Sequence, residues 1–251
     1  MPSLSIVAAC QFAPKLFEVD NNVAVAQQMT FEAFAKGARV VVLPECCTSG
    51  YSFQNEQEAA KCAQSRDGWQ TQSFVQLCKS FNSHVVFGYV ELHEGKLYNS
   101  AAIVGPKGLE GNSQKHNRFG SDALWATPSE AMFPIVLSAA GRLGCVICKD
   151  VRNNYRDSYV HYDPDHKFYR KGDVDTIALP VNWAQNFSFP GDAWLDLQES
   201  TAANVIVANR FGKERDTKFK GGSCVISRDG TVYTNGNEFD APCIVGGVAT
   251  V

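Results

Sequence analysis

The chain has 251 residues, of which 45% are hydrophobic and 20% are charged, and its formal net charge is −3. This balance is typical of a globular protein and excludes an intrinsically disordered chain. The slight acidic excess argues against a nucleic-acid-binding protein, which needs a basic surface. No apolar run is long enough to cross a bilayer. We expect one domain over residues 1–251, because single α/β domains commonly reach this length.

Strand and helix signals alternate from the start of the chain. The apolar run Leu4–Cys10 predicts a buried strand. A helix is predicted next, capped by Asn21 or Asn22 and ended by Gly37. The sequence RVVVL at Arg39–Leu43 predicts a second buried strand, which a proline stops. The pattern continues with a helix at Ser73–Phe81 and a hairpin of Val85–Leu92 and Leu97–Val104.

The second half of the chain is richer in strands. They are expected at Leu143–Cys148, Asp175–Pro180, Ala203–Ala208, Ser223–Ser227 and Thr231–Thr234. Asp229-Gly230 is a strong turn signal between the last two. Hairpins combined with strands separated by helices predict an α/β fold with mixed sheets and helices outside. The segment Asn153–Gly172 is too long for a simple connection, and its role is left open.

Chemistry-bearing residues follow three of these strands. Glu45 follows VVVLP, Cys148 follows GCVI, and Asn182 and Trp183 follow IALPV. In α/β sheets, sites gather beyond the carboxyl ends of strands. A nucleophilic cysteine needs a group that takes its proton and a group that stabilises the oxyanion. Glu45 is a candidate for the first task and Lys115 for the second.

Eight motifs, in order, together resemble the nitrilase, or carbon–nitrogen hydrolase, superfamily. They are AACQFAP, GARVVVLPECCTSGY, LYNSAAIVGPKG, QKHNRFGSDALWATPS, GRLGCVICKDVR, LPVNWA, VANRFG and GGSCVISRDG. The resemblance covers nearly the whole chain, although no single motif is decisive. It implies an α-β-β-α sandwich and a Glu–Lys–Cys triad formed by Glu45, Lys115 and Cys148.

The resemblance also implies a mechanism. Cys148 would attack the carbon of a small amide, with Glu45 as general base and Lys115 stabilising the oxyanion. The backbone N–H of Lys149 would be a second oxyanion donor. Ammonia or an amine would leave, and water would release a carboxylic acid from the thioester. No metal or organic cofactor is expected. The substrate itself stays open, although Asp122, Lys149 and Arg152 favour a polar, zwitterionic amide.

Three positions depart from the family pattern. Asp122 stands where many members carry a second Glu, so it either supports catalysis or has a structural role. Lys149 replaces a frequent Tyr, and its side chain either faces the site or forms a salt bridge elsewhere. The usual Arg-Phe-Pro-Glu is replaced by Arg152 followed by Asn-Asn-Tyr, which puts the substrate pocket in doubt.

Aromatic and polar residues near the triad are candidates for the pocket wall. We expect substrate binding by Tyr51, Trp125, Asn182 and Trp183, against the alternative of core packing for each aromatic ring. The family places the equivalent of Trp183 beside the nucleophile. Arg210 is expected to be structural.

Other chemistry fits the cysteines and histidines less well. Cys145 and Cys148 form a CxxC pair, but no second ligand pair is present for zinc, and residues three apart on a strand diverge. The five histidines are scattered, which argues against a Cys–His protease. The nine cysteines cannot all pair, and most lie in apolar runs, so a reducing compartment is expected.

Location and partners are expected from the same features. Val7–Cys10 resembles a lipoprotein cleavage site but lacks a basic segment before it, so a cytoplasmic protein is expected. The partners would be a small-molecule amide and a second copy of the chain in a homodimer, with no nucleic acid and no membrane. Because the chain ends at Val251 soon after its last strand, larger assemblies that depend on a tail are not expected.

Two classes of function remain after these observations. The first is an amide hydrolase, with a nitrilase or an acyl-transferring enzyme as its variants. The second is a catalytically silent binding protein on the same fold. The presence of Glu45, Lys115 and Cys148 favours the enzyme.

Overall fold

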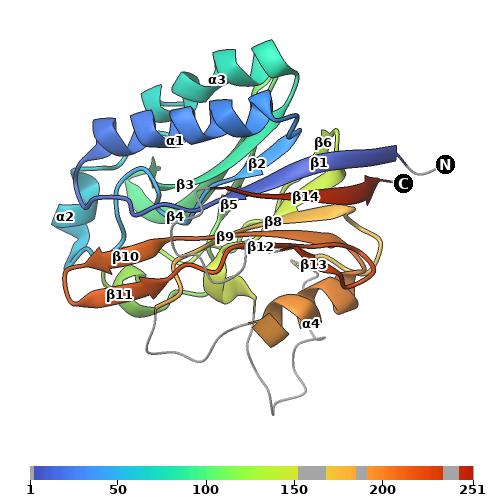
Figure 1. Ribbon diagram of the computed structural model, residues 1–251. Coiled ribbons are helices and arrows are strands. Elements are labelled where there is room, and N and C mark those ends of the chain that lie inside the picture. Colours follow the sequence, from blue (N-terminus) through green and yellow to red (C-terminus); the bar gives the residue numbers. More distant parts are fainter. Residues whose placement is uncertain (1–2, 152–167, 185–190, 234–242, 251) are drawn as a thin grey trace.

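The computed structural model describes residues 3–151, 168–184, 191–233 and 243–250. Two stacked β-sheets lie between outer layers of helices (Figure 1). Helices α1 (Val19–Ala35) and α3 (Trp69–Phe81) cover one outer face, and α4 (Gly191–Thr201) covers the other. The α-β-β-α sandwich expected from the sequence is therefore confirmed.

Each sheet has six strands. The first has the order β14-β1-β2-β3-β4-β5, with bounds Cys243–Thr250, Ser3–Cys10, Val40–Val42, His84–His93, Lys96–Gly105 and Gly108–Gln114. The second has the order β13-β12-β9-β8-β7-β6, with bounds Val232–Tyr233, Cys224–Ile226, Asn204–Asn209, Thr176–Val181, Gly141–Cys145 and Ile135–Ser138. The smaller elements are α2 (Glu56–Ala60), the 3-10 turns η1 (Gly120–Leu124) and η2 (Cys148–Asp150), and the hairpin of β10 (Phe211–Glu214) and β11 (Thr217–Lys220).

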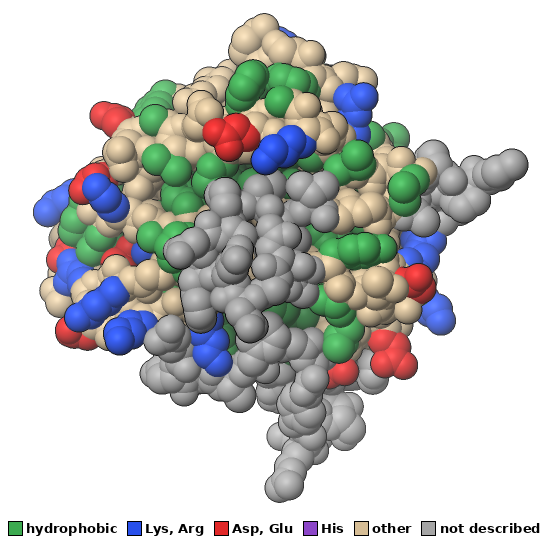
Figure 2. All heavy atoms as spheres, in the orientation of Figure 1, with side chains coloured by type: hydrophobic (Ala, Val, Ile, Leu, Met, Phe, Trp, Pro, Cys, Tyr) green, Lys and Arg blue, Asp and Glu red, His purple; other side chains and the backbone are tan. Residues whose placement is uncertain are grey.

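Alternation along the strands builds two layers of core. On β1, Val7 and Ala9 belong to the cluster between the sheets, whereas Ala8 and Cys10 pack with the residues of α1 and α3. This is the two-residue period of a strand that is buried on both faces. The face in Figure 2 carries both Lys and Arg and Asp and Glu side chains.

Parallel strands bring the candidate residues to one end of the sandwich. Strands β1, β2 and β3 run parallel in the first sheet, and β7, β8 and β9 run parallel in the second. Glu45 lies three residues beyond β2, Cys148 three residues beyond β7, and Asn182 directly after β8. Lys115 follows β5 on the first sheet.

Several local expectations are corrected. Helix α1 begins at Val19, and Asn22 does not cap it. The Asn22 amide instead accepts the N–H of Lys15 at 2.8 Å and donates to its carbonyl at 2.7 Å, so it binds the preceding loop. The strand expected to reach Cys148 ends at Cys145, because the chain turns into η2. Helix α3 begins at Trp69, four residues earlier than expected.

The remaining outcomes concern segments and cysteines. Of Asn153–Gly172, only residues 168–172 are described, and they hold no helix or strand; Arg152 also lies outside the described residues. In the described parts of the chain no helix combines the length and hydrophobicity needed to cross a membrane. The cysteines whose side chains are described are all buried: Cys10, Cys46, Cys47, Cys62, Cys78, Cys145, Cys148 and Cys224.

Candidate functional site

Glu45 is held in a tight turn against strand β3. The N–H of Gly88 donates to the carbonyl of Pro44 at 3.2 Å, and the N–H of Thr48 donates to the carbonyl of Gly88 at 3.4 Å. A Cβ on Gly88 would lie 2.3 Å from the backbone nitrogen of Cys46 and 2.6 Å from the Cα of Glu45. Only glycine permits this approach. The glycine on β3 thus fixes where the Glu45 carboxylate lies.

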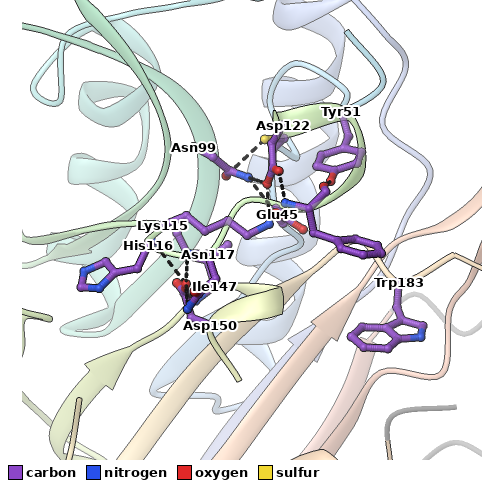
Figure 3. Close-up of polar contacts among 12 residues, drawn as sticks. Glu45, Tyr51, Asn99, Lys115, His116, Asn117, Asp122, Ile147, Asp150 and Trp183 are labelled. Carbon is purple, nitrogen blue, oxygen red and sulfur yellow. Dashed lines mark hydrogen bonds and ion pairs between the residues drawn. The ribbon is translucent and has the colours of Figure 1, made fainter. Parts of the chain in front are cut away.

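Lys115 joins two buried carboxylates (Figure 3). Its Nζ lies 2.7 Å from Oε1 of Glu45 and 2.5 Å from Oδ2 of Asp122. Nδ2 of Asn99 donates to the same two oxygens, at 2.7 Å to Glu45 and 3.0 Å to Asp122. Oε2 of Glu45 has no hydrogen-bond partner among the described residues. One oxygen of this carboxylate is therefore fixed, and the other remains available.

Burial and neighbouring charges have opposing effects on the pKa of Glu45 and on the pKa of Lys115. Burial raises the pKa of the Glu45 carboxyl above its ordinary value, and the neighbouring Lys115 ammonium only partly offsets this. Burial alone would lower the pKa of Lys115, but Glu45 and Asp122 outweigh it and the pKa is raised. Lys115 is therefore a cation, and Glu45 is a stronger base than an exposed carboxylate.

Cys148 lies in the first position of η2 with a φ of 44°. This left-handed conformation costs a residue with a side chain about 1–2 kcal/mol. The Glu45 carboxylate, the Lys115 ammonium and the backbone N–H of Asn182 all lie close enough to the Cys148 thiol to shift its pKa. Burial raises the pKa of this thiol well above its ordinary value, and the charge of Glu45 adds to the rise. Attack by Cys148 therefore needs a base that removes its proton.

Asp122 is buried and reaches Lys115 although its side chain is shorter than that of Glu. Its second oxygen, Oδ1, accepts the backbone N–H of Phe119 at 2.5 Å. Asp122 thus ties down the start of η1, which is a structural role, and it also pairs with Lys115; its support of catalysis stays a prediction.

Lys149 follows Cys148 and is not in a salt bridge with any described carboxylate. Its Nζ lies 5.5 Å from the centre of the Phe119 ring, within the range of a cation–π contact. The Tyr51 hydroxyl donates to the carbonyl of Phe119, and burial raises the pKa of Tyr51. Lys149 and Tyr51 therefore both contact Phe119, the first at its ring and the second at its backbone carbonyl, three residues before Asp122.

The other expected pocket residues surround the same end of the sandwich. Asn182 is buried, and both polar atoms of its side chain lack a partner among the described residues. Trp183 is half-buried and lies to one side of the charged cluster (Figure 3). Trp125 is buried and packs edge-on against Phe53 with ring centres 5.6 Å apart, and its Nε1 has no described partner.

Arg210 lies further from the charged cluster. It bonds to Glu214 at 2.7 Å, and Glu214 accepts the backbone N–H of Tyr51 at 2.9 Å and of Ser52 at 2.7 Å. Its guanidinium therefore supports the loop that follows Glu45, which is the structural kind of role expected for it.

Two residues of the site were not singled out by the sequence. Asn99 lies in the motif LYNSAA, and its amide bridges Glu45 and Asp122. Asp150 lies two residues beyond Cys148 and accepts backbone N–H groups from two segments. Burial raises the pKa of Asp150 to about 7, and hydrogen bonds from the backbone and the charge of Lys115 limit the rise. A polar residue inside an apolar strand motif was the available signal for Asn99.

A family model described as carbon–nitrogen hydrolase matches residues 6–161. The chain belongs to the carbon–nitrogen hydrolase family, and its resemblance to the nitrilase superfamily is confirmed. Among its relatives, a protein of Pyrococcus abyssi named nitrilase is 29% identical over 233 residues, which cover 92% of this chain and 85% of that protein. The protein N-terminal amidase of Schizosaccharomyces pombe is 26% identical, with coverage of 86% and 88%.

Solved structures agree on the fold. A CN-hydrolase superfamily protein from Xanthomonas campestris, with an arsenic adduct in its active site, has a TM-score of 0.81 at 17% identity and covers 98% of this chain and 91% of its own. An amidase from Nesterenkonia has a TM-score of 0.77 at 18% identity, with coverage of 98% and 90%. At these identities the likeness establishes the nitrilase-type fold.

Proposed function

We propose that this chain is an amidase that hydrolyses a small linear amide through a thioester on Cys148. The observation that carries the proposal is the state of Glu45. One oxygen of this buried carboxylate is held by Lys115 and Asn99, while Oε2 has no described partner and the Cys148 thiol lies within its electrostatic reach. A carboxylate with a raised pKa and one available oxygen is suited to proton transfer.

The first half of the reaction forms the thioester. Glu45 takes the thiol proton as the sulfur of Cys148 bonds to the amide carbon, and the carbonyl oxygen becomes an oxyanion. The Lys115 ammonium and the backbone N–H of Lys149 stabilise that oxyanion. Glu45 then gives the proton to the nitrogen, the C–N bond breaks, and ammonia or an amine leaves.

The second half releases the acid. Glu45 takes a proton from water, and the hydroxide attacks the thioester carbon. The C–S bond breaks, the carboxylic acid leaves, and the thiol of Cys148 regains its proton. Throughout both halves Asp122 shares Lys115 with Glu45, which supports a role in keeping the ammonium in place.

The residues around Glu45 and Cys148 favour a polar amide as the substrate. Asn182 supplies a buried carboxamide whose oxygen and nitrogen lack described partners, which suits hydrogen bonding to a substrate. Lys149 offers a cation over Phe119, and Trp183 and Trp125 supply apolar surface. We therefore propose that Asn182, Trp183, Tyr51 and Trp125 form the walls. Turnover of simple apolar amides alone would contradict this.

The Pyrococcus abyssi relative, which is named nitrilase, favours a second candidate function, nitrile hydrolysis. The same thiol would add to the nitrile carbon, and ammonia would leave after water has added. The amidase is preferred because the Schizosaccharomyces pombe relative and the Nesterenkonia neighbour both carry that name, and a variant of the latter holds an acetamide group on its active-site cysteine. Acyl transfer to an amine in place of water is a third outcome of the test.

The test is ammonia release from a panel of small amides, ω-amides, carbamoyl amines and nitriles. Wild type is compared with Cys148→Ala, and intact-mass spectrometry follows acyl adducts. Ammonia and an adduct that both disappear in Cys148→Ala would support the thioester mechanism, and the best substrate would decide between amide and nitrile. If wild type neither releases ammonia nor forms an adduct with a reactive amide such as fluoroacetamide, the silent binding protein replaces the enzyme.

Two expectations on the protein's surroundings stay predictions. A homodimer would be seen as twice the chain mass in sedimentation, and a monomer would contradict it. Cytoplasmic location would be tested by fractionation.

A further inference from the structure

Asp150 is a buried carboxylate that the proposed reaction does not use. It is 3% exposed and is the last residue of η2. Its Oδ1 accepts the backbone N–H of His116 at 3.0 Å and of Asn117 at 2.8 Å, and its Oδ2 accepts that of Ile147 at 3.3 Å. Figure 3 shows these bonds converging on one side chain. The side-chain Nδ2 of Asn117 also donates to Oδ1, at 3.4 Å, so among the described residues the hydrogen bonds to Asp150 come from amides and not from a cationic side chain.

The donors come from two segments on different sheets. His116 and Asn117 directly follow Lys115, beyond the end of β5 on the first sheet. Ile147 directly precedes Cys148, beyond the end of β7 on the second sheet. The backbone N–H of Lys115 is itself bound to the carbonyl of Asn99 on β4 at 2.9 Å. Asp150 therefore ties the segment that carries the candidate oxyanion cation to the turn that carries the candidate nucleophile.

A carboxylate fits this place better than an amide. It presents two acceptor oxygens to N–H groups that arrive from two directions, whereas Asn would present one oxygen and one NH₂ group. An NH₂ group at either oxygen would face N–H donors and leave at least one buried N–H unpaired. The titratable groups close to Asp150 are the Lys115 ammonium, beyond β5, and the neutral thiol of Cys145, at the end of β7, whose pKa burial raises. The ring of His116 points elsewhere, stacked on Phe133 at 4.3 Å.

We propose that Asp150 is a positioning residue, which holds Lys115 at the distance from Cys148 that oxyanion stabilisation requires. This inference rests on the proposed roles of Cys148 and Lys115. Asp150 touches neither substrate nor reacting atoms in this account. Loss of this positioning should therefore slow the amide reaction, in which a carbonyl oxygen becomes charged, far more than it slows a reaction of the thiol that forms no oxyanion.

The experiment compares two reactions of the same cysteine. Steady-state kcat and KM are measured by ammonia release on the best amide of the panel. The rate of S-methylthiolation of Cys148 by methyl methanethiosulfonate, which has no carbonyl group, is measured by peptide mass spectrometry. For Asp150→Asn we expect kcat to fall about 100-fold, the cost of a displacement of about 1 Å at a reacting centre. KM and the methylthiolation rate should stay within threefold of wild type.

Asp175 supplies a matched control. Asp175 directly precedes β8 and is also buried. It accepts the backbone N–H of Arg142 at 2.9 Å, but its other hydrogen bonds come from the side chains of Arg142 and Arg228. Asp175→Asn should lower the midpoint of unfolding and leave kcat within twofold. Circular dichroism checks that each variant is folded. If Asp150→Asn does not fold, Asp150→Glu keeps the charge, moves it by one methylene, and should give the same split.

An Asp150 variant that keeps wild-type kcat, or that slows amide turnover and methylthiolation equally, would overturn the inference. Failure of the proposed function is recognised separately, because wild type itself would then release no ammonia that depends on Cys148. In that case the positioning role is also overturned, since it has no reaction to act on.

Discussion

Glu45 and Glu91 are both fully buried carboxylates of the first sheet, but their surroundings differ. Glu91 receives donors at both oxygens. Arg66 bonds to Oε1 at 2.9 Å, and Oε2 accepts from Ser100 at 2.6 Å, Asn112 at 2.8 Å and Gln114 at 3.0 Å. Glu45 is bound through Oε1 alone, by Lys115 and Asn99.

The difference separates two uses of a buried charge. A carboxylate with hydrogen-bond donors at both oxygens stabilises the strands around it and has no oxygen free to take up a proton. A carboxylate with a buried, unpartnered oxygen is costly for stability and is retained where that oxygen reacts. Under the proposed function, Glu91 therefore represents the structural case and Glu45 the chemical case. The predictions that follow challenge this division, beginning with the largest expected effect.

Replacing Glu45 by Gln should lower kcat about 1,000-fold, because the base of both halves of the reaction is lost. The free energy of unfolding should change by no more than about 1 kcal/mol, since Lys115 keeps Asp122 as its ion-pair partner and a neutral amide is easier to bury. Ammonia release and urea unfolding measure the two quantities. A variant that loses stability in proportion to activity would contradict the division.

Replacing Glu91 by Gln should give the opposite pattern. Breaking this ion pair should cost about 2–3 kcal/mol of unfolding free energy, less than for a fully buried pair because the Arg66 side chain is 40% exposed. Activity should stay within twofold of wild type. Urea unfolding measures the loss of unfolding free energy, provided that its dependence on urea concentration is the same in both proteins. A fall in kcat like that of Glu45→Gln would refute a purely structural role of Glu91.

Replacing Asn99 by Ser should move the pH profile of kcat/KM. In the proposed reaction Glu45 works as a carboxylate, so activity should be present above its pKa and be lost as the pH falls through it. The pKa is already raised by burial, and the Asn99 amide holds it down. Loss of this hydrogen bond should shift the acid limb upward by about one pH unit. Asn112→Ser removes an amide from Glu91 instead and should leave the limb in place. An acid limb that does not move in Asn99→Ser would show that Asn99 does not hold down the pKa of Glu45.

The smallest effect is expected for two tyrosines. Tyr51→Phe removes the bond to the Phe119 carbonyl beside Asp122, and should lower kcat/KM about fivefold, which corresponds to about 1 kcal/mol. Tyr89→Phe removes a bond of 2.8 Å to Asn112 in the Glu91 cluster, and should cost about 1 kcal/mol of stability with kcat/KM unchanged. Equal effects of the two substitutions on kcat/KM would contradict the division between the surroundings of Glu45 and those of Glu91.

The apolar runs predicted mixed sheets with helices outside, because buried strands are apolar, and the resemblance to the nitrilase superfamily implied the sandwich and the candidate site residues. Edge strands escaped it: β5 reads GLEGNSQ, which has no apolar alternation, and β6 has four residues. The roles of Asn99 and Asp150 also escaped it. They depend on which carboxylates or N–H groups converge in space, and such convergence leaves no local pattern. Asn22 shows the converse, since a good capping residue was used to bind the loop at Lys15.

The location of the candidate residues on separate sheets has a consequence for folding. Glu45 and Lys115 come from the first sheet and Cys148 from the second, so neither sheet holds a complete site. Contacts between distant parts of a chain form slowly, because loop closure is costly. During refolding, secondary structure should therefore recover before ammonia release does. The recovery of enzymatic activity would then report when one sheet finally docks on the other.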